Sequence, residues 1–130
     1  MKTVIAAYCF KGKGKNHKLA IVTSSSGRWL IPKGHYEDDS YNQLLALEEA
    51  WEEAGVKGKI AGGPYSFVID RGGKAKWKIY SVKIRSLAQD WPEKQQRKRR
   101  LVKPLEAAEL IDCPDLVSAI VGIAETYKKD

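Results

Sequence analysis

Apolar runs separated by polar segments predict short strands in the first part of the chain. Residues 4–10 and 18–23 are apolar runs typical of strands, and the Gly- and Lys-rich segment between them predicts a hairpin turn. The Gly12-x-Gly14 spacing in that segment lacks the Gly-Lys-Ser/Thr ending of a phosphate-binding loop. We therefore interpret these glycines as turn residues.

A helical pattern that ends at Ala54 forms the centre of the chain. The apolar run 29–31 stops at Pro32, and residues 33–35 are predicted to form a turn before the helix. Gly55 follows the helix, as a C-terminal capping glycine does. The predicted buried stripe, at helical spacing, consists of Leu44, Leu47, Trp51 and Ala54.

The second half of the chain alternates between strands and helices. We expect an extended segment at 56–61, a break at the glycines and proline of 62–64, and a hairpin of strands 65–69 and 76–84. A last strand at 97–102 precedes a short helix at 105–111 and a C-terminal helix at 115–127. This order predicts an α/β fold with a mixed sheet between helices.

Length and composition indicate one globular domain, residues 1–130. Hydrophobic residues make up 43% of the chain and charged residues 30%, as in ordinary globular proteins. Apolar runs all fall short of the roughly 20 residues of a membrane helix, so we expect no membrane partner. Cys9 and Cys113 are far apart in the sequence, which favours buried free thiols in the cytoplasm.

The net charge of +7 favours an acidic ligand. Nucleic acid and phosphate-rich small molecules both satisfy this condition. The aromatic residues are not spaced like a base-stacking platform, so nucleic acid is the less favoured partner. The sequence leaves a monomer and a homodimer open.

Three glutamates on the central helix are candidate metal ligands. Glu49, Glu52 and Glu53 stand at i, i+3 and i+4, which places their carboxylates on one helical face. A solvated acidic surface is the simpler interpretation of such spacing. The tight Gly34 turn just before the helix favours a divalent cation, because Mg²⁺ takes oxygen ligands from one or two carboxylates and from substrate phosphates.

At residues 34–56 the chain resembles the Nudix box, Gly-x5-Glu-x7-Arg-Glu-U-x-Glu-Glu-x-Gly-U, where U is aliphatic. Gly34 matches its first glycine, and the second half matches without gaps except at the arginine. The matching positions there are Glu49, Ala50, Glu52, Glu53, Gly55 and Val56.

The flanking segments RWLIPKG, DWPEKQQRKRR and PLEAAELI resemble the diphosphoinositol-polyphosphate phosphohydrolase-like branch of the Nudix hydrolases, especially its short bacterial members. This resemblance implies an α/β/α sandwich with a mixed β-sheet and a loop-helix-loop catalytic motif. It also implies an enzyme that cleaves pyrophosphate bonds with Mg²⁺ or Mn²⁺.

The resemblance suggests a role for each acidic residue. Glu49 and Glu53 are the expected metal ligands, and the carbonyl group of Gly34 or Lys33 is a further candidate ligand. Glu52 is the candidate general base, because its counterpart has that role in the same branch. A carboxylate suits this step, since it accepts the proton of the attacking water.

Basic residues near the acidic cluster are candidates for holding substrate phosphates. Their positions in the resembling branch point to Arg28, Lys33 and His35, with Arg97 and Arg99 as further candidates. A solvated basic edge is the alternative for the last two. His17, in the lysine-rich turn, is expected at the surface.

Two positions depart from the box pattern. Ser40 replaces its first glutamate and Glu48 replaces its arginine. We expect a pyrophosphohydrolase acting on a phosphate-rich small molecule such as a dinucleoside polyphosphate, a diphosphoinositol polyphosphate or a nucleoside diphosphate derivative. The alternative is an inactive Nudix-like module that binds a nucleotide or RNA. The two departures could also compensate each other, since an acid and its possible partner are lost together.

Overall fold

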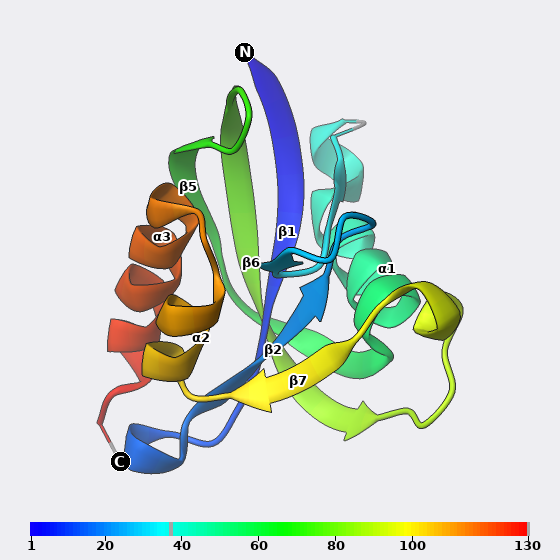
Figure 1. Ribbon diagram of the computed structural model, residues 1–130, viewed down its shortest axis with the longest axis vertical. Coiled ribbons are helices and arrows are strands. Elements are labelled where there is room, and N and C mark those ends of the chain that lie inside the picture. Colours follow the sequence, from blue (N-terminus) through cyan, green and yellow to red (C-terminus); the bar gives the residue numbers. More distant parts are fainter. Residues whose placement is uncertain (37, 130) are drawn as a thin grey trace.

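The computed structural model describes residues 1–36 and 38–129, and its centre is a seven-stranded β-sheet (Figure 1). The main path has the order β3-β2-β1-β6-β5, while β4 pairs with β1 and β7 pairs with β2. β1 and β6 run parallel and the other pairs are antiparallel, so the sheet is mixed as predicted. The strands are β1 (Lys2–Lys11), β2 (Lys18–Thr23), β3 (Trp29–Leu30), β4 (Lys33–His35), β5 (Val56–Asp70), β6 (Lys74–Leu87) and β7 (Arg99–Val102).

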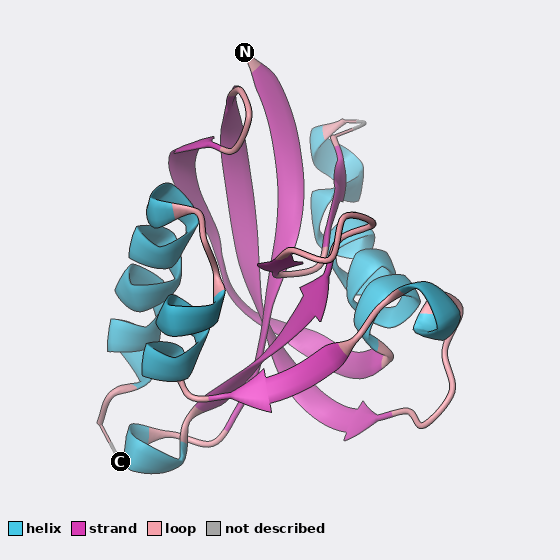
Figure 2. Ribbon diagram, in the orientation of Figure 1, coloured by secondary structure: helices cyan, strands magenta, loops and turns pink. Residues whose placement is uncertain are grey.

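Helices cover both faces of the sheet (Figure 2). α1 (Asn42–Ala54) lies on one face, and α2 (Pro104–Leu110) and α3 (Pro114–Ala124) lie on the other. This arrangement confirms the α/β/α sandwich. Short 3-10 turns complete the chain: η1 (Gly14–Asn16), η2 (Asp39–Tyr41), η3 (Lys94–Gln96) and η4 (Glu125–Tyr127).

The strand β1 separates two hydrophobic cores. Its residues 4–10 are all buried, because successive side chains point to opposite faces and both faces are covered. Ile5 and Cys9 pack in the core beneath α1, whereas Ala6 and Tyr8 pack in the core beneath α2 and α3. Within the described residues, no helix is long and apolar enough to span a membrane.

The predicted turn at 33–35 is a strand instead. β4 pairs antiparallel with β1, placing Gly34 opposite Ile5 and His35 opposite Val4. Paired residues in a sheet share a face, so Gly34 faces α1 while Lys33 and His35 face the other side. The local sequence does not predict this strand, because its hydrogen-bond partners lie in β1, nearly thirty residues earlier in the chain.

The predicted break at 62–64 is also wrong. β5 continues through these residues and pairs with β6 on both sides of them. The register shifts between Ile60 and Gly62 and again between Gly62 and Tyr65. The glycines therefore produce a bulge within one long strand rather than its end.

The buried face of α1 agrees with the predicted stripe at Ala54 but not at the larger residues. Leu44 is 52% exposed, and Leu47 and Trp51 are only half-buried. The buried residues include Ala46, Ala50 and Ala54, spaced i, i+4 and i+8. Small alanine side chains let the helix approach the sheet closely. Because the alanine side of α1 faces the sheet, Glu53 is buried with it.

The predicted surface position of His17 is wrong, whereas the prediction of buried free cysteines is confirmed. The His17 ring is buried with its Nε2 atom 2.7 Å from the hydroxyl oxygen of Tyr8 and its Nδ1 atom 3.0 Å from the carbonyl oxygen of Gly12. Both ring nitrogens therefore have partners, which allows the imidazole to be buried.

Gly55 ends α1 in the left-handed conformation, with φ of 64°. We expect Gly55→Ala to lower the free energy of unfolding by about 1–2 kcal/mol through this conformation alone. An added Cβ atom would also lie 2.9 Å from Trp91 and from the Arg99 guanidinium, which raises the cost further. Urea denaturation measures the loss. Gly72→Ala is the matched control, because Gly72 has φ of 72° with open space around it. Equal losses in the two variants would contradict the contact contribution.

Candidate active site

The strand β4 holds two carboxylates of α1 against the sheet. A Cβ atom on Gly34 would lie 2.6 Å from the Oε1 atom of Glu49, so only glycine allows this carboxylate to approach the strand. The backbone N–H of Lys33 donates a hydrogen bond of 3.3 Å to Oε1 of Glu53. β4 thus brings the candidate metal ligands Glu49, Glu53 and Gly34 into one place.

Burial and mutual repulsion change the acidity of this pair. Burial, together with the charges of Glu53 and Glu52, raises the pKa of Glu49 to about 8. Burial also raises the pKa of Glu53, and the positive charge of Arg97 opposes that rise. Each of the two carboxyl groups contributes to the pKa of the other, while Glu52 is exposed beside them. A perturbed pair of this kind is typical of functional sites.

Arg97 links the acidic pair to the loop before β7. Its Nη2 atom lies 3.5 Å from Oε2 of Glu53, and its Nε atom donates to Oε1 of Glu93 at 2.7 Å. Its Nη1 atom donates to the carbonyl oxygen of Thr23 at 2.8 Å. Sequence analysis missed Glu93, although its i, i+4 spacing to Arg97 was an available signal.

Arg99 contacts the end of α1 rather than the acidic pair. Its Nη1 atom donates to the carbonyl oxygens of Ala54 at 2.8 Å and Ala88 at 2.9 Å. Its guanidinium lies 4.2 Å from the ring centroid of Trp91, whose indole N–H donates to the carbonyl oxygen of Glu53. These contacts satisfy carbonyl groups at the helix C-terminus, where a positive charge is favourable. Substrate binding by Arg99 stays a prediction.

The remaining predicted phosphate ligands are Arg28, which pairs with a residue before α3, and Lys33 and His35, which both lie on β4. Arg28 donates two hydrogen bonds of 3.1 Å and one of 2.9 Å to the carboxylate of Asp112, which precedes α3. The hydrogen bonds and charge of Arg28 lower the pKa of Asp112. His35 is exposed at the end of β4, and Lys33 is half-buried. Lys33 alone of these three bonds to the acidic pair, through its backbone.

Two polar grooves each include a residue that contacts Glu53. The first has a volume of about 450 Å³ and includes Arg97, Lys94 and Lys98. The second has a volume of about 400 Å³ and is lined by Lys33 together with Lys2, Arg71 and Lys74. The described linings of both grooves contain basic residues and no acidic ones. The basic residues of the first groove come from residues 94–98, whereas those of the second come from three separate parts of the chain that only the fold brings together.

The donor set fits Mg²⁺ or Mn²⁺ held partly by other ligands. Among the described residues, no group of three or more His, Cys, Asp or Glu side chains is arranged to hold a metal by itself. Mg²⁺ is usually bound by one or two carboxylates, with waters and substrate phosphates completing its shell. Glu49 and Glu53 supply two such carboxylates, and a bound cation would neutralise the repulsion that raises the pKa of Glu49.

The two departures from the box pattern, Ser40 and Glu48, both within the described residues, lie on different elements and form no hydrogen bond with each other. Ser40 lies in η2, where its backbone N–H donates to Oδ1 of Asp38 at 2.9 Å. Glu48 is exposed on α1. Compensation between the two positions therefore stays a hypothesis, which the variants Ser40→Glu and Glu48→Arg test when combined; additive effects on turnover would contradict it.

The raised pKa of Glu49 predicts how stability depends on pH without metal. An unfolded glutamate titrates near pH about 4.3, so between there and pH about 8 the folded state keeps a proton that the unfolded state has lost. The free energy of unfolding in EDTA should fall as pH rises through this window and then level off. Urea denaturation across the window measures the slope, which Glu49→Gln should flatten. Glu48→Gln is the matched control, and an unchanged slope in Glu49→Gln would contradict the assignment.

Known proteins share this sequence and this fold, although no family model matches the chain. Nudix hydrolase 16, mitochondrial, from Arabidopsis thaliana is 32% identical over 127 residues, which cover 89% of this chain and 71% of the relative. Human diphosphoinositol polyphosphate phosphohydrolase 3-alpha is 29% identical over 117 residues, covering 88% and 71% of the two chains.

Solved structures agree on the fold. A NUDIX hydrolase from Nitrosomonas europaea superposes with a TM-score of 0.76 at 15% identity, covering 98% of this chain and 90% of the other. The C. elegans Ap4A hydrolase gives 0.74 at 14% identity, covering 97% and 98%. With the box, the acidic pair and the α/β/α sandwich, these similarities show that the chain belongs to the Nudix hydrolase family, as a pyrophosphohydrolase.

Proposed function

We propose that this protein hydrolyses a pyrophosphate bond in a phosphate-rich small molecule, using Mg²⁺ or Mn²⁺. The observation that carries the proposal is the pair of Glu49 and Glu53, held against Gly34 of β4 and contacted by Arg97. The net charge of +7 suits a negatively charged ligand, and the acidic pair suits a cation bound with that ligand.

Glu49 and Glu53 would hold the metal, with the carbonyl group of Gly34 as a further ligand. A bound divalent cation neutralises phosphate charge and lowers the pKa of a bound water. Arg97 keeps the carboxylate of Glu53 in position, and the backbone of Lys33 fixes the other oxygen of that carboxylate.

Glu52 would accept the proton of the attacking water. It is exposed, one helical turn from Glu49 and adjacent to Glu53, so solvent and substrate can both reach it. A general base must lie within reach of the proton that it accepts, and the exposure of Glu52 allows this.

The basic groove that contains Lys94, Arg97 and Lys98 supports a phosphate-rich substrate. Arg97 lines this groove and also contacts Glu53. Arg28 and His35 are further candidate phosphate ligands. Diphosphoinositol polyphosphates, after which several relatives are named, and dinucleoside polyphosphates are the first compounds to test.

A second candidate is a Nudix-like module that binds a nucleotide without turnover. Glu48 favours it, because the box arginine is replaced by a further negative charge on the same helix. The intact Glu49, Glu52 and Glu53 favour hydrolysis. The two buried thiols support a reducing compartment, and we propose the cytoplasm.

A substrate panel tests the proposal. Phosphate and nucleotide release would be measured for dinucleoside polyphosphates, nucleoside triphosphates, sugar nucleotides and diphosphoinositol polyphosphates, with EDTA, Mg²⁺ or Mn²⁺. We expect metal-dependent turnover that Glu53→Gln abolishes. Glu109→Gln, an exposed glutamate of α2, is the matched control. Metal binding without turnover of any compound would favour the binding module.

A further inference from the structure

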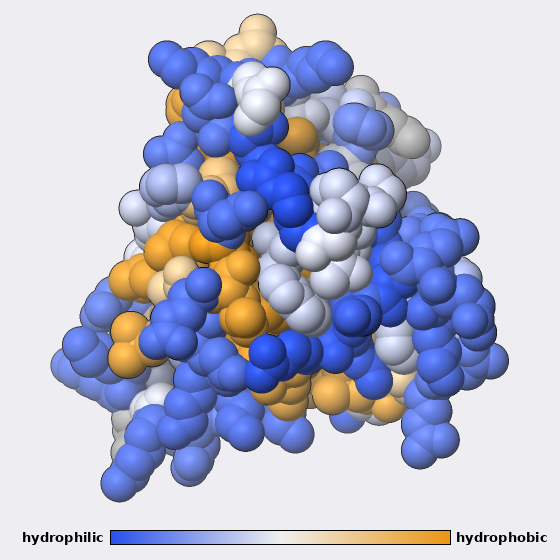
Figure 3. All heavy atoms as spheres, in the orientation of Figure 1, coloured by the Kyte–Doolittle hydropathy of each residue, from blue (hydrophilic) through white to orange (hydrophobic). Residues whose placement is uncertain are grey.

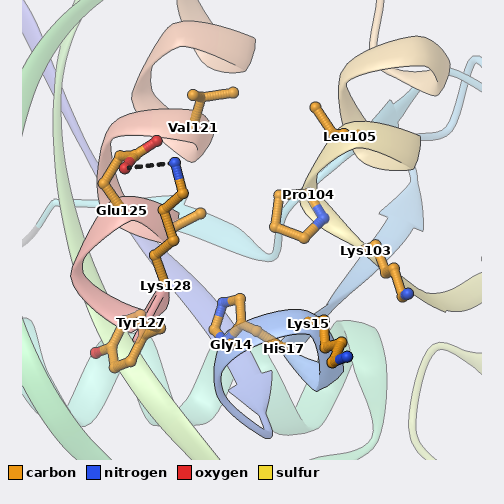
Figure 4. Close-up of a pocket in the computed structure, with 11 residues that line it drawn as sticks. Gly14, Lys15, His17, Lys103, Pro104, Leu105, Val121, Glu125, Tyr127 and Lys128 are labelled. Carbon is orange, nitrogen blue, oxygen red and sulfur yellow. Dashed lines mark ion pairs between the residues drawn. The ribbon is translucent and has the colours of Figure 1, made fainter. Parts of the chain in front are cut away.

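A cavity of about 520 Å³ lies between η1, the start of α2 and the end of α3 (Figure 4). Its lining contains none of the residues assigned to the acidic pair or to the two basic grooves. It therefore forms a separate feature on the other face of the sheet from α1. Its volume falls within the range of about 300–1,000 Å³ that is typical of small-molecule sites.

The wall of the cavity is apolar and unusually exposed. Leu105 is 78% exposed and Val121 is 36% exposed, and both side chains point toward the cavity beside Pro104. Apolar surface gathers over α2 and α3 in the space-filling view (Figure 3). A ligand that covers these side chains would remove apolar area from water, which is favourable.

The floor of the cavity is aromatic and offers no free ring nitrogen. The rings of His17 and Tyr127 stack at 5.0 Å between centroids with planes 7° apart. Both nitrogens of His17 are already bonded, to the hydroxyl group of Tyr8 and the carbonyl oxygen of Gly12. The floor therefore suits an apolar body rather than a polar one.

Lysine side chains line the same cavity. Lys15 comes from η1, Lys103 from the segment before α2, and Lys128 from the end of the chain (Figure 4). The acidic residue in the described lining is Glu125, whose carboxylate lies 3.7 Å from the amine of Lys128. The excess positive charge is complementary to one or two negative charges on a ligand.

We propose that this cavity binds a small amphipathic anion, with an apolar body of about two fused rings and one carboxylate or phosphate. The apolar body would lie over Leu105 and Val121, and the anionic group would lie between the amines of Lys15 and Lys103. A flat nucleic-acid surface is disfavoured, because the cavity is concave and its wall is aliphatic. The proposal does not depend on the hydrolase activity.

Amide shifts of the full chain in two-dimensional NMR test this site with 2-naphthoate as the probe. We expect saturable shifts at Gly14, Leu105 and Val121, with 2-naphthyl phosphate binding similarly and neutral 2-naphthol binding more weakly. Leu105→Asn should weaken naphthoate binding about tenfold, since a leucine side chain that becomes buried under the ligand contributes on that order. Lys103→Gln should weaken it about threefold, as expected for an exposed ion pair.

Matched controls and contrary outcomes are available. Val68→Asn and Lys83→Gln change an exposed apolar residue and an exposed lysine elsewhere, and both should leave binding unchanged. A native-like spectrum of each variant establishes that it folds. The proposal is overturned by absent saturable shifts at the cavity, by equal weakening in the controls, or by naphthol binding as tightly as naphthoate. Shifts along α2 and α3 with an acidic peptide but not with naphthoate would assign the cavity to a protein partner and overturn it too.

Discussion

Glu52→Gln is expected to lower kcat by about 10²- to 10⁴-fold, the contribution typical of a general base. Glutamine keeps the size of the side chain but cannot accept the proton of the attacking water. Because Glu52 is exposed, the variant should fold like the parent chain. Its affinity for Mg²⁺ should change little, since Glu49 and Glu53 remain.

Single-turnover rates at saturating Mg²⁺, together with Mg²⁺ titrations, separate these effects. Glu48→Gln is a close control, because Glu48 is an exposed glutamate one turn earlier on α1. A normal rate in Glu52→Gln would move the base to another carboxylate. A loss of Mg²⁺ binding that equals the loss of rate would instead make Glu52 a metal ligand.

Arg97→Gln is expected to lower the free energy of unfolding by about 2–4 kcal/mol, because it removes the charged partner of a buried carboxylate and leaves it the hydrogen bond from the Lys33 backbone. The side chains of Arg97 and Glu53 are only 19% and 8% exposed. The positive charge of Arg97 lowers the pKa of Glu53, so its removal raises that pKa. A larger fraction of Glu53 is then protonated at neutral pH, and Mg²⁺ affinity and turnover should fall together.

Urea denaturation and Mg²⁺ titration of Arg97→Gln measure both effects. Arg100→Gln is the control, because Arg100 pairs with Glu106 at 2.6 Å where both side chains are nearly half-exposed. Such a surface pair should contribute less than about 1 kcal/mol. Arg97→Lys should restore the charge but not all three contacts, and so recover only part of the stability. A loss in Arg97→Gln no larger than that in Arg100→Gln would refute the role.

Local sequence signals predicted the elements whose ends are set by nearby residues. Gly55 ends α1 because glycine adopts the left-handed conformation readily, and this preference is visible in the sequence. The β1–β2 hairpin follows from two apolar runs around a short polar segment. β4 was missed because three residues form a strand only when β1 supplies their partners.

The candidate site was predictable in its chemistry but less so in its burial. Helical spacing alone places Glu49 and Glu53 one turn apart. Which side of α1 faces the sheet depends on the close approach that Ala46 and Ala50 allow, and a preference for large apolar residues predicted the stripe wrongly at those residues. Arg97 looked like one member of a solvated basic run, and only tertiary contacts distinguish it from its neighbours.

The two buried cysteines make the chain suitable for site-specific labelling. Burial raises the pKa of Cys9 strongly, and Cys113 is covered between β5 and α3, where its Sγ atom lies 3.5 Å from the carbonyl oxygen of Asp70. Alkylating reagents attack exposed thiolates, so both native thiols should react slowly in the folded protein. A single cysteine introduced at an exposed position such as Ser66 would then carry a maleimide fluorophore without removal of the native cysteines.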